Sequence, residues 1–269
     1  MTDCYYYDEY TLGSVGSLDS VVDCTYVLIM TNSSRKEQIK QQLQYAGLTS
    51  NIIFQYNRGY KTCDKQLKHN KPNYDLCHAN QTAFKHALNR GYNRILLLED
   101  DCEFDSRIQD PKILSDINHF LHNNDPDIYN LGPIICTTSP IDIILGKDHR
   151  RILLSFTTHA VIYNKKYMNW LVHNSCLLGH SDNTHNIHWS KFTYKIPLAY
   201  QKTILTENAK DGWRYVYPIV NTLFYKPFRL DTKVQPGHDY VRIIFDILTL
   251  ILFLLFVKYL YVLYNKIRK

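Results

Sequence analysis

A short apolar run that stops abruptly on three carboxylates constrains the fold of this chain more than any other feature. Three leucines at positions 96–98 are followed directly by Glu99, Asp100 and Asp101. A continuous apolar run of this kind is typical of a strand buried on both faces of a parallel sheet. Open α/β sheets bind their ligands at the carboxyl ends of their strands, so we expect the three acids at a binding edge.

The three adjacent acids also predict a cation. Neighbouring carboxylates repel one another, and a divalent metal or a positive ligand removes that cost. Carboxylate oxygens are hard ligands that favour Mg²⁺ or Mn²⁺. We therefore expect one of these ions at the end of this strand.

Strand and helix patterns alternate through the first half of the chain. The expected strands are Thr25–Met30, Asn51–Tyr56, Arg94–Leu98 and Ile128–Leu131. Ser34 and Glu37 predict a capping box at the start of a helix, and Asp110 predicts the start of another. Gly47 and Gly91 each predict the end of a helix. This alternation indicates a three-layer α/β domain of Rossmann type with a mostly parallel sheet and right-handed crossovers.

The bulk composition indicates a folded domain. The chain has 269 residues, 45% of them hydrophobic, which is enough to bury a sizeable core. The formal net charge of +6 comes from scattered Lys and Arg without a basic block, so we expect no nucleic-acid partner.

The cysteines and the N-terminal residues predict a reducing environment. None of the seven cysteines forms a CxxC pair, and the first twenty residues lack the pattern of a secretion signal. We therefore expect reduced thiols in a domain that faces the cytosol. Residues 1–22, acidic and rich in tyrosine, are expected to be mobile.

A C-terminal apolar segment predicts a membrane anchor. Ile243–Tyr264 is almost wholly apolar, and about 22 residues in a helix reach roughly 33 Å. Its charges are Asp246 and Lys258, and the uninterrupted part, Ile247–Val257, also fits a buried or interfacial helix. We expect a mobile segment at 1–22, a catalytic domain at 23–240, a transmembrane anchor at 241–264 and a basic tail at 265–269.

Two features of the sequence predict opposite orientations of this anchor. The positive-inside rule places the basic tail in the cytosol and the large domain across the membrane. That arrangement needs a translocation signal, which the first twenty residues do not show. We therefore expect a tail anchor with the domain in the cytosol.

The segments at 75–104, 158–171 and 195–205 together resemble glycosyltransferase family 25, the lipopolysaccharide and collagen galactosyltransferase-like group. Asp75–Phe104, DLCHANQTAFKHALNRGYNRILLLEDDCEF, has the spacing of that family's helix and following strand that ends LEDD. Thr158–Leu171, THAVIYNKKYMNWL, looks like its small-residue strand and helix. Lys195–Leu205, KIPLAYQKTIL, is similar to its closing proline-Gln segment. The chain departs from the family at 76–78. The family usually has a Gly or Ser next to a Cys before its helix, whereas this chain has Leu-Cys-His there.

This resemblance implies a GT-A type fold that transfers a hexose from a nucleotide-sugar donor to a glycan or glycoprotein, with inversion. On this pattern Asp101 is the metal ligand, Glu99 contacts the ribose and Asp100 is a supporting acid. Asn130 follows a strand and is expected to line the donor pocket, and His159 is expected to complete the metal shell. The alternative for the acids is that some of them simply cap a following turn.

An inverting transfer also needs a carboxylate that takes the proton of the acceptor hydroxyl. Asp182 is our first candidate, followed by Glu207 and Asp211. The family's later acidic motif is not clearly reproduced at 180–183, and an isolated acid in a loop is ordinarily solvated.

Other classes of function compete with this interpretation. The acid-ended strand also resembles the first strand of a response-regulator receiver domain, which binds Mg²⁺. Asp142 would then be the phospho-acceptor, and Lys195 or Lys202 the later lysine, although a strand-helix-strand unit already precedes the acids. A non-catalytic, membrane-tethered module that binds sugar or nucleotide is a further alternative.

A zinc site is a separate alternative for the histidines of the second half. It can be drawn from Cys176, His180, His185 and His188. Their spacing matches no standard zinc finger.

Overall fold

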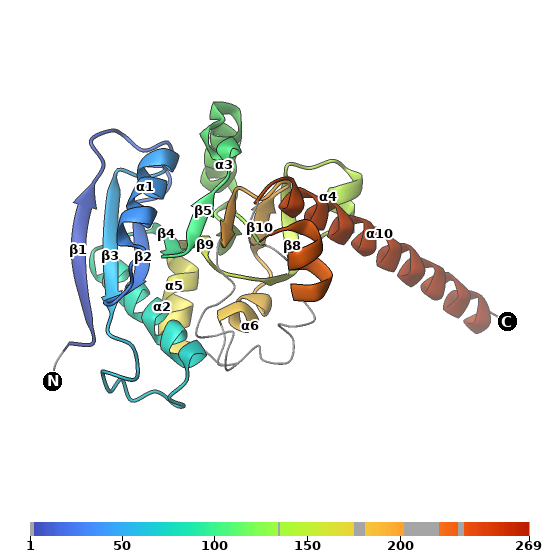
Figure 1. Cartoon of the computed structure of the whole chain (residues 1–269). Helices are drawn as coiled ribbons and strands as arrows, with labels where there is room; N and C mark the ends of the chain where they lie inside the picture. Colours follow the sequence, from blue (N-terminus) through green and yellow to red (C-terminus); the bar gives the residue numbers. More distant parts are fainter. Residues whose placement is uncertain (1–2, 134, 175–180, 202–220, 231–233, 269) are drawn as a thin grey trace.

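A mixed sheet with helices on both faces organises the chain in the computed structural model (Figure 1). The model describes residues 3–133, 135–174, 181–201, 221–230 and 234–268. The strands are β1 (Tyr5–Thr11), β2 (Cys24–Met30), β3 (Asn51–Asn57), β4 (Arg94–Glu99), β5 (Cys102–Phe104), β6 (Ile128–Asn130), β7 (Ile135–Thr138), β8 (His149–Phe156), β9 (Ala160–Asn164), β10 (Lys191–Tyr194) and β11 (Ala199–Gln201). The helices are α1 (Lys36–Ala46), α2 (Pro72–Asn89), η1 (Ser106–Gln109), α3 (Pro111–Asn124), α4 (Pro140–Ile144), α5 (Lys165–Asn174), α6 (Ser181–Asn186), η2 (Asn221–Tyr225), α9 (Lys226–Phe228) and α10 (Val234–Ile267).

The large sheet has the strand order β1-β3-β2-β4-β9-β6-β10-β8-β7, and β5 and β11 form a separate two-stranded ribbon. Neighbours β3, β2 and β4 are parallel, whereas β9 lies antiparallel between β4 and β6. Since β6 and β10 are parallel, both run in the same direction as β4. Strands β1, β8 and β9 run against this direction, so the expected parallel sheet is present with antiparallel strands added.

The two faces of the sheet are covered by different helices, as alternation along the strands requires. Val27 and Ile29 of β2 belong to the core that includes α1 and α3. Tyr26 and Leu28 belong to the core that includes α2 and α5. The prediction of a three-layer α/β domain is therefore confirmed.

The expectation of a mobile N-terminal segment is wrong. β1 pairs antiparallel with β3 over its whole length, from Tyr5 opposite Asn57 to Thr11 opposite Asn51. The ring of Tyr6 stacks on Tyr56 with 4.5 Å between centroids. Tyrosines supply enough apolar surface to hold an acidic strand on the sheet edge, which the overall composition did not suggest.

Most helix ends follow their predicted signals, with one exception. Gly47 takes a left-handed conformation after α1, and the Asp110 side chain accepts from the Lys112 amide at 2.9 Å. The capping box of Ser34 and Glu37 does not form, because α1 starts after Arg35, without a side-chain cap.

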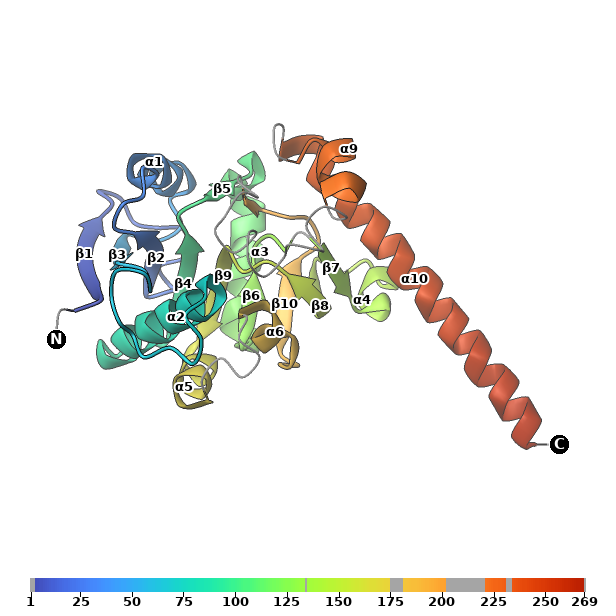
Figure 2. The same cartoon turned by 60° about the horizontal axis from the view of Figure 1, so that its bottom comes forward.

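Helix α10 leaves the domain and extends away from it (Figures 1 and 2). Its first turns dock on the domain through Arg107–Asp239 at 2.9 Å and Arg150–Asp246 at 2.6 Å. Asp246, which interrupts the apolar sequence, is therefore neutralised by the domain. Beyond it most apolar side chains are exposed, and the helix is long and apolar enough to cross a membrane.

Candidate functional site

The carboxyl ends of the central strands β2, β3 and β4 lie side by side and form the carboxyl edge of the sheet. Met30 at the end of β2 lies opposite Asn57 at the end of β3, and Leu28 lies opposite Glu99 at the end of β4. The loops that follow these strands therefore share this edge, where an α/β sheet binds its ligands.

Asp101 lies in the turn after β4 and is 3% exposed. Its Oδ2 accepts from Gln201 Nε2 at 3.0 Å, whereas its Oδ1 has no hydrogen-bond partner among the described residues. Burial, and then the charge of Asp100, raise the pKa of Asp101 to about 6. A buried carboxylate with an unpaired oxygen is costly unless a proton or a cation joins it.

Asp100 is held by the loop that follows β2. Ser33 Oγ donates to its Oδ2 at 2.5 Å, and Arg35 Nη1 donates to its Oδ1 at 3.3 Å. The same Arg35 nitrogen lies 3.7 Å from Oδ2 of Asp101. Arg35 thus places a positive charge beside both acids. Ser33 and Arg35 were not predicted from the sequence, although a loop after the first parallel strand belongs to this edge.

Glu99 and His159 are joined through the backbone. The Glu99 amide donates to the His159 carbonyl at 2.9 Å, and Thr158 Oγ1 donates to Glu99 Oε1 at 3.4 Å. Burial lowers the pKa of His159 to about 4. The Ala199 carbonyl opposes that shift, yet neither ring nitrogen makes a well-formed hydrogen bond to a described residue. His159 is thus a buried, neutral ring on a residue whose backbone bonds Glu99.

Asn130 lies at the same edge, at the end of β6, with its side-chain amide already bonded. Its Nδ2 donates to the Thr157 carbonyl at 3.0 Å, and its Oδ1 accepts from the Gly132 amide at 3.0 Å. Thr157 has φ of +92°, which is unusual for a β-branched residue, so the turn before His159 is strained. Asn130 therefore holds the strained turn in place.

The donor set fits a divalent ion only in part. Asp100 and Asp101 supply hard oxygen atoms, and one oxygen of Asp101 lacks a partner. Among the described residues, however, no group of three His, Cys, Asp or Glu side chains could hold a metal ion. An ion here would need further ligands from a bound molecule, and a diphosphate has suitable oxygens.

The candidate catalytic bases are placed only partly. Asp182 lies in α6, and its neighbour Ser181 accepts from Asn80 Nδ2 of α2 at 3.0 Å. Glu207 and Asp211 lie outside the described residues.

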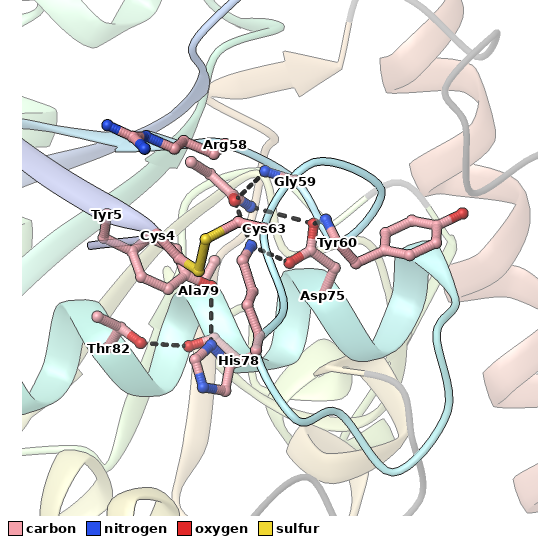
Figure 3. A network of polar contacts seen from close by, with 12 residues as sticks. Cys4, Tyr5, Arg58, Gly59, Tyr60, Cys63, Asp75, His78, Ala79 and Thr82 are labelled. Atoms are coloured by element: carbon pink, nitrogen blue, oxygen red, sulfur yellow. Dashed lines mark hydrogen bonds and ion pairs between the residues drawn. A yellow bond between two sulfur atoms is a disulfide. The ribbon is translucent and has the colours of Figure 1, made fainter. Parts of the chain in front are cut away.

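A second polar cluster at this edge, shown in Figure 3, was not expected from the sequence. The Lys65 side chain is wholly buried, and its Nζ bonds Asp75 and Asn57. Asp75 also accepts from the Tyr60 amide at 3.2 Å. The ring of Tyr5 lies 4.5 Å from the Lys65 ammonium group, and burial lowers the pKa of this lysine. The cluster ties the loop after β3 to the first turn of α2.

The cysteines contradict the expectation of reduced thiols. Cys4 and Cys63 form a disulfide that joins the start of β1 to the loop after β3 (Figure 3), and Cys77 is also disulfide-bonded. Among the described residues, the free cysteines Cys24, Cys102 and Cys136 are buried. Structural disulfides are rare in the cytosol, so this pattern argues against a cytosol-facing domain.

The receiver alternative does not fit the structure. Asp142 lies in α4, where it accepts from the Arg151 amide at 2.9 Å and pairs with Lys147 at 2.8 Å. Strands β9, β6 and β10 separate β4 from β8, on which α4 packs. Asp142 therefore does not share an ion with the acids after β4.

The two described histidines of the proposed zinc site, His185 and His188, contact other side chains. His185 Nε2 bonds the Tyr163 hydroxyl at 2.8 Å, and the His188 ring packs on Trp170 at 4.2 Å. Cys176 and His180 lie outside the described residues.

Comparisons with known proteins give only distant likenesses. No family model and no curated protein matches the chain. The crystal structure of A197 from STIV matches with a TM-score of 0.40 and 10% identity, over 68% of this chain and 86% of that one. A glycosyltransferase involved in the glycosylation of the major capsid of PBCV-1 matches with a TM-score of 0.39 and 10% identity, over 72% of this chain and 99% of that one.

Proposed function

We propose that this chain is a membrane-anchored glycosyltransferase with a GT-A-like domain of the family 25 type. It moves a hexose from a nucleotide-sugar donor to a glycan or glycoprotein acceptor with inversion, and it depends on Mn²⁺ or Mg²⁺.

The observation that carries the proposal is the unpaired oxygen of Asp101. A chain gains nothing for folding by burying a carboxylate with one oxygen unbonded beside a second acid. At the carboxyl ends of parallel strands, such a group is suited to binding a ligand that brings positive charge. A donor diphosphate with its divalent ion is such a ligand, since the ion neutralises the charge of the leaving group.

The neighbouring residues then have separate roles. Asp101 holds the ion, Asp100 supports it through the bond from Ser33, and Arg35 offers a positive charge to the donor phosphates. Glu99 contacts the ribose. His159, which we expected as a further ligand, is buried and neutral and so retains a free electron pair for this role.

The acceptor hydroxyl must lose its proton as the new bond forms. Asp182, Glu207 and Asp211 remain our candidates for the carboxylate that takes it. Asn130 serves the donor pocket indirectly, by fixing the turn that precedes His159.

We further propose that the domain lies on the oxidising side of the membrane, opposite to the orientation that the first twenty residues suggested. The Cys4–Cys63 disulfide supports this side, and the basic tail with Lys266 and Arg268 then stays in the cytosol, as the positive-inside rule prefers. Alkylation of intact cells before and after reduction tests the placement. Cys4 and Cys63 should react with thiol reagents only after reduction, whereas reaction without reduction would contradict it.

The activity is tested with the full chain in detergent and a panel of nucleotide sugars, with and without Mn²⁺. We expect one donor to release its nucleoside diphosphate only with metal, and Asp101→Asn to lose this activity. Asp125→Asn is the matched control, because Asp125 follows α3 and pairs with Arg94 at the start of β4, whereas Asp101 follows the end of β4. Donor binding without turnover would favour the non-catalytic module, and neither binding nor turnover for any donor would contradict the proposal.

A further inference from the structure

Helix α4 presents an apolar face to the outside of the domain. Ile141, Ile144 and Leu145 are 56%, 62% and 64% exposed. Residues three and four positions apart lie on the same face of a helix, so these three side chains form one patch, the α4 patch. A cluster of large exposed aliphatic side chains usually marks a contact surface.

The opposite face of α4 is fixed to the domain by polar contacts. Asp142 is buried, accepts from the Arg151 amide at 2.9 Å and pairs with Lys147 at 2.8 Å. The Ser139 hydroxyl accepts from the Asp142 amide at 3.3 Å and the Ser139 amide donates to the Arg151 carbonyl at 2.8 Å. Because these bonds set the rotation of the helix, the α4 patch is directed outward by the fold itself.

The α4 patch lies where α10 leaves the domain. Thr138, just before α4, donates from Oγ1 to Asp246 at 3.5 Å, and Arg150 pairs with the same carboxylate at 2.6 Å. Both views show α4 beside α10 (Figures 1 and 2), and the two helices are in contact. Asp246 is also the last charged residue before the apolar run Ile247–Val257. The α4 patch is therefore level with the start of that run.

We propose that the α4 patch enters the interfacial layer of the bilayer that α10 crosses. Its occupant is phospholipid, because the patch is aliphatic, adjoins the anchor at its point of exit and has the half-exposed Lys147 beside it. The inference rests on the proposed anchoring role of α10. With two attachments, the domain is held at a restricted angle to the membrane.

The test uses the full chain reconstituted in phosphatidylcholine vesicles whose acyl chains carry bromine, which quenches tryptophan on contact. Three variants are compared with the parent chain, which has three tryptophans of its own. Ile144→Trp reports on the α4 patch, and Leu254→Trp, 64% exposed on α10, reports on the anchor. Val15→Trp, 87% exposed near the β1 end of the sheet, is the control away from the membrane.

We expect bromine near the headgroup to quench Ile144→Trp, bromine deeper in the chains to quench Leu254→Trp, and neither to quench Val15→Trp. Quenching of Leu254→Trp without Ile144→Trp would overturn the patch proposal and leave the anchor intact. A blue-shifted but unquenched Ile144→Trp would mean that protein covers the patch, which also overturns it. An unquenched Leu254→Trp would overturn the anchor itself. Donor turnover of the three variants in detergent is a separate measurement, so loss of the proposed enzyme activity is distinguished from loss of membrane contact.

Discussion

Two clusters of aspartate and arginine flank the short strand β5, and they differ in how completely their acids are bonded. Before β5, Asp101 has one oxygen without a partner among the described residues, and burial raises its pKa to about 6. After β5, both oxygens of Asp105 accept hydrogen bonds, from Arg107, Tyr200 and Gln235. Burial acts against ionisation there too, but these bonds hold the pKa of Asp105 at about 2.

Strand β11 contributes a side chain to each cluster, because consecutive side chains of a strand point to opposite faces. Tyr200 of β11 bonds Asp105, and the next residue, Gln201, bonds Asp101. Arg107 also pairs with Asp239 and so docks α10. The fully bonded acid therefore serves folding, whereas the partly bonded acid keeps a position open for a ligand.

The largest effect on folding is expected from Asp105→Asn. The variant leaves Arg107 with only the half-exposed Asp239 as a counter-charge, and we expect the free energy of unfolding to fall by about 2–4 kcal/mol. Denaturant unfolding of the full chain in detergent measures this. Glu9→Gln, which breaks an exposed pair with Arg90, is the control and should cause no measurable change. Equal losses in both variants would refute the special role of the Asp105 cluster.

Asp101→Asn is expected to change stability in the opposite direction. Its pKa of about 6 lies above the ordinary value of 3.8, so at neutral pH the buried charge costs folding free energy. The neutral amide removes that cost, and we expect a gain of about 1 kcal/mol in the absence of ligand. The same unfolding assay applies, and a clear loss of stability would show that Asp101 is a structural acid.

The Asp101 and Asp105 clusters should respond to acid in different pH ranges. Protonation of Asp101 below about pH 6 competes with a cation, so Mn²⁺ affinity in the presence of a nucleoside diphosphate should fall by about tenfold per pH unit there. The depressed pKa of Asp105 stabilises the fold above its unfolded value of 3.8, and this contribution is lost only as the pH falls towards about 2. Mn²⁺ affinity and unfolding measured from pH 7.5 to 2 should therefore decline in different ranges, and a common midpoint would contradict the distinction.

The smallest effect is expected from Gln201→Leu. Its hydrogen bond lowers the pKa of Asp101, so the variant should shift the pH midpoint of Mn²⁺ binding upward by less than about one unit. Tyr200→Phe is the matched control on the same strand, and it should weaken folding by about 1 kcal/mol without moving that midpoint. A shift in the control as large as in Gln201→Leu would mean that the two faces of β11 are not independent.

The central layers of the fold were predictable because their signals are local. Strand β4 contains the apolar run Ile95–Leu98, and Gly47 ends α1 in the left-handed conformation that favours glycine. The strand Tyr5–Thr11 was missed because its stability comes from pairing with β3 and not from an apolar pattern of its own.

The candidate site was predictable only where its residues adjoin one another in sequence. Asp100 and Asp101 stand out at the end of a strand, whereas their partners Arg35 and Gln201 lie 65 and 100 positions away. Lys65 likewise reaches Asp75 from a loop without a periodic pattern. Such contacts depend on how the strands are ordered, and a single sequence does not encode that order locally.

Binding of Mn²⁺ to the full chain in detergent, followed by loss of the free-ion signal in electron paramagnetic resonance, tests the central claim most directly. The titration is run with and without nucleoside diphosphates, for the parent chain and for Asp101→Asn, and the Mn²⁺ bound by each nucleoside diphosphate alone is subtracted. We predict that one nucleoside diphosphate makes the parent chain bind about one Mn²⁺ ion and that Asp101→Asn binds none. Equal binding by both chains, or no binding by the parent chain with any nucleoside diphosphate, would contradict the assignment of Asp101 as the ligand-binding acid.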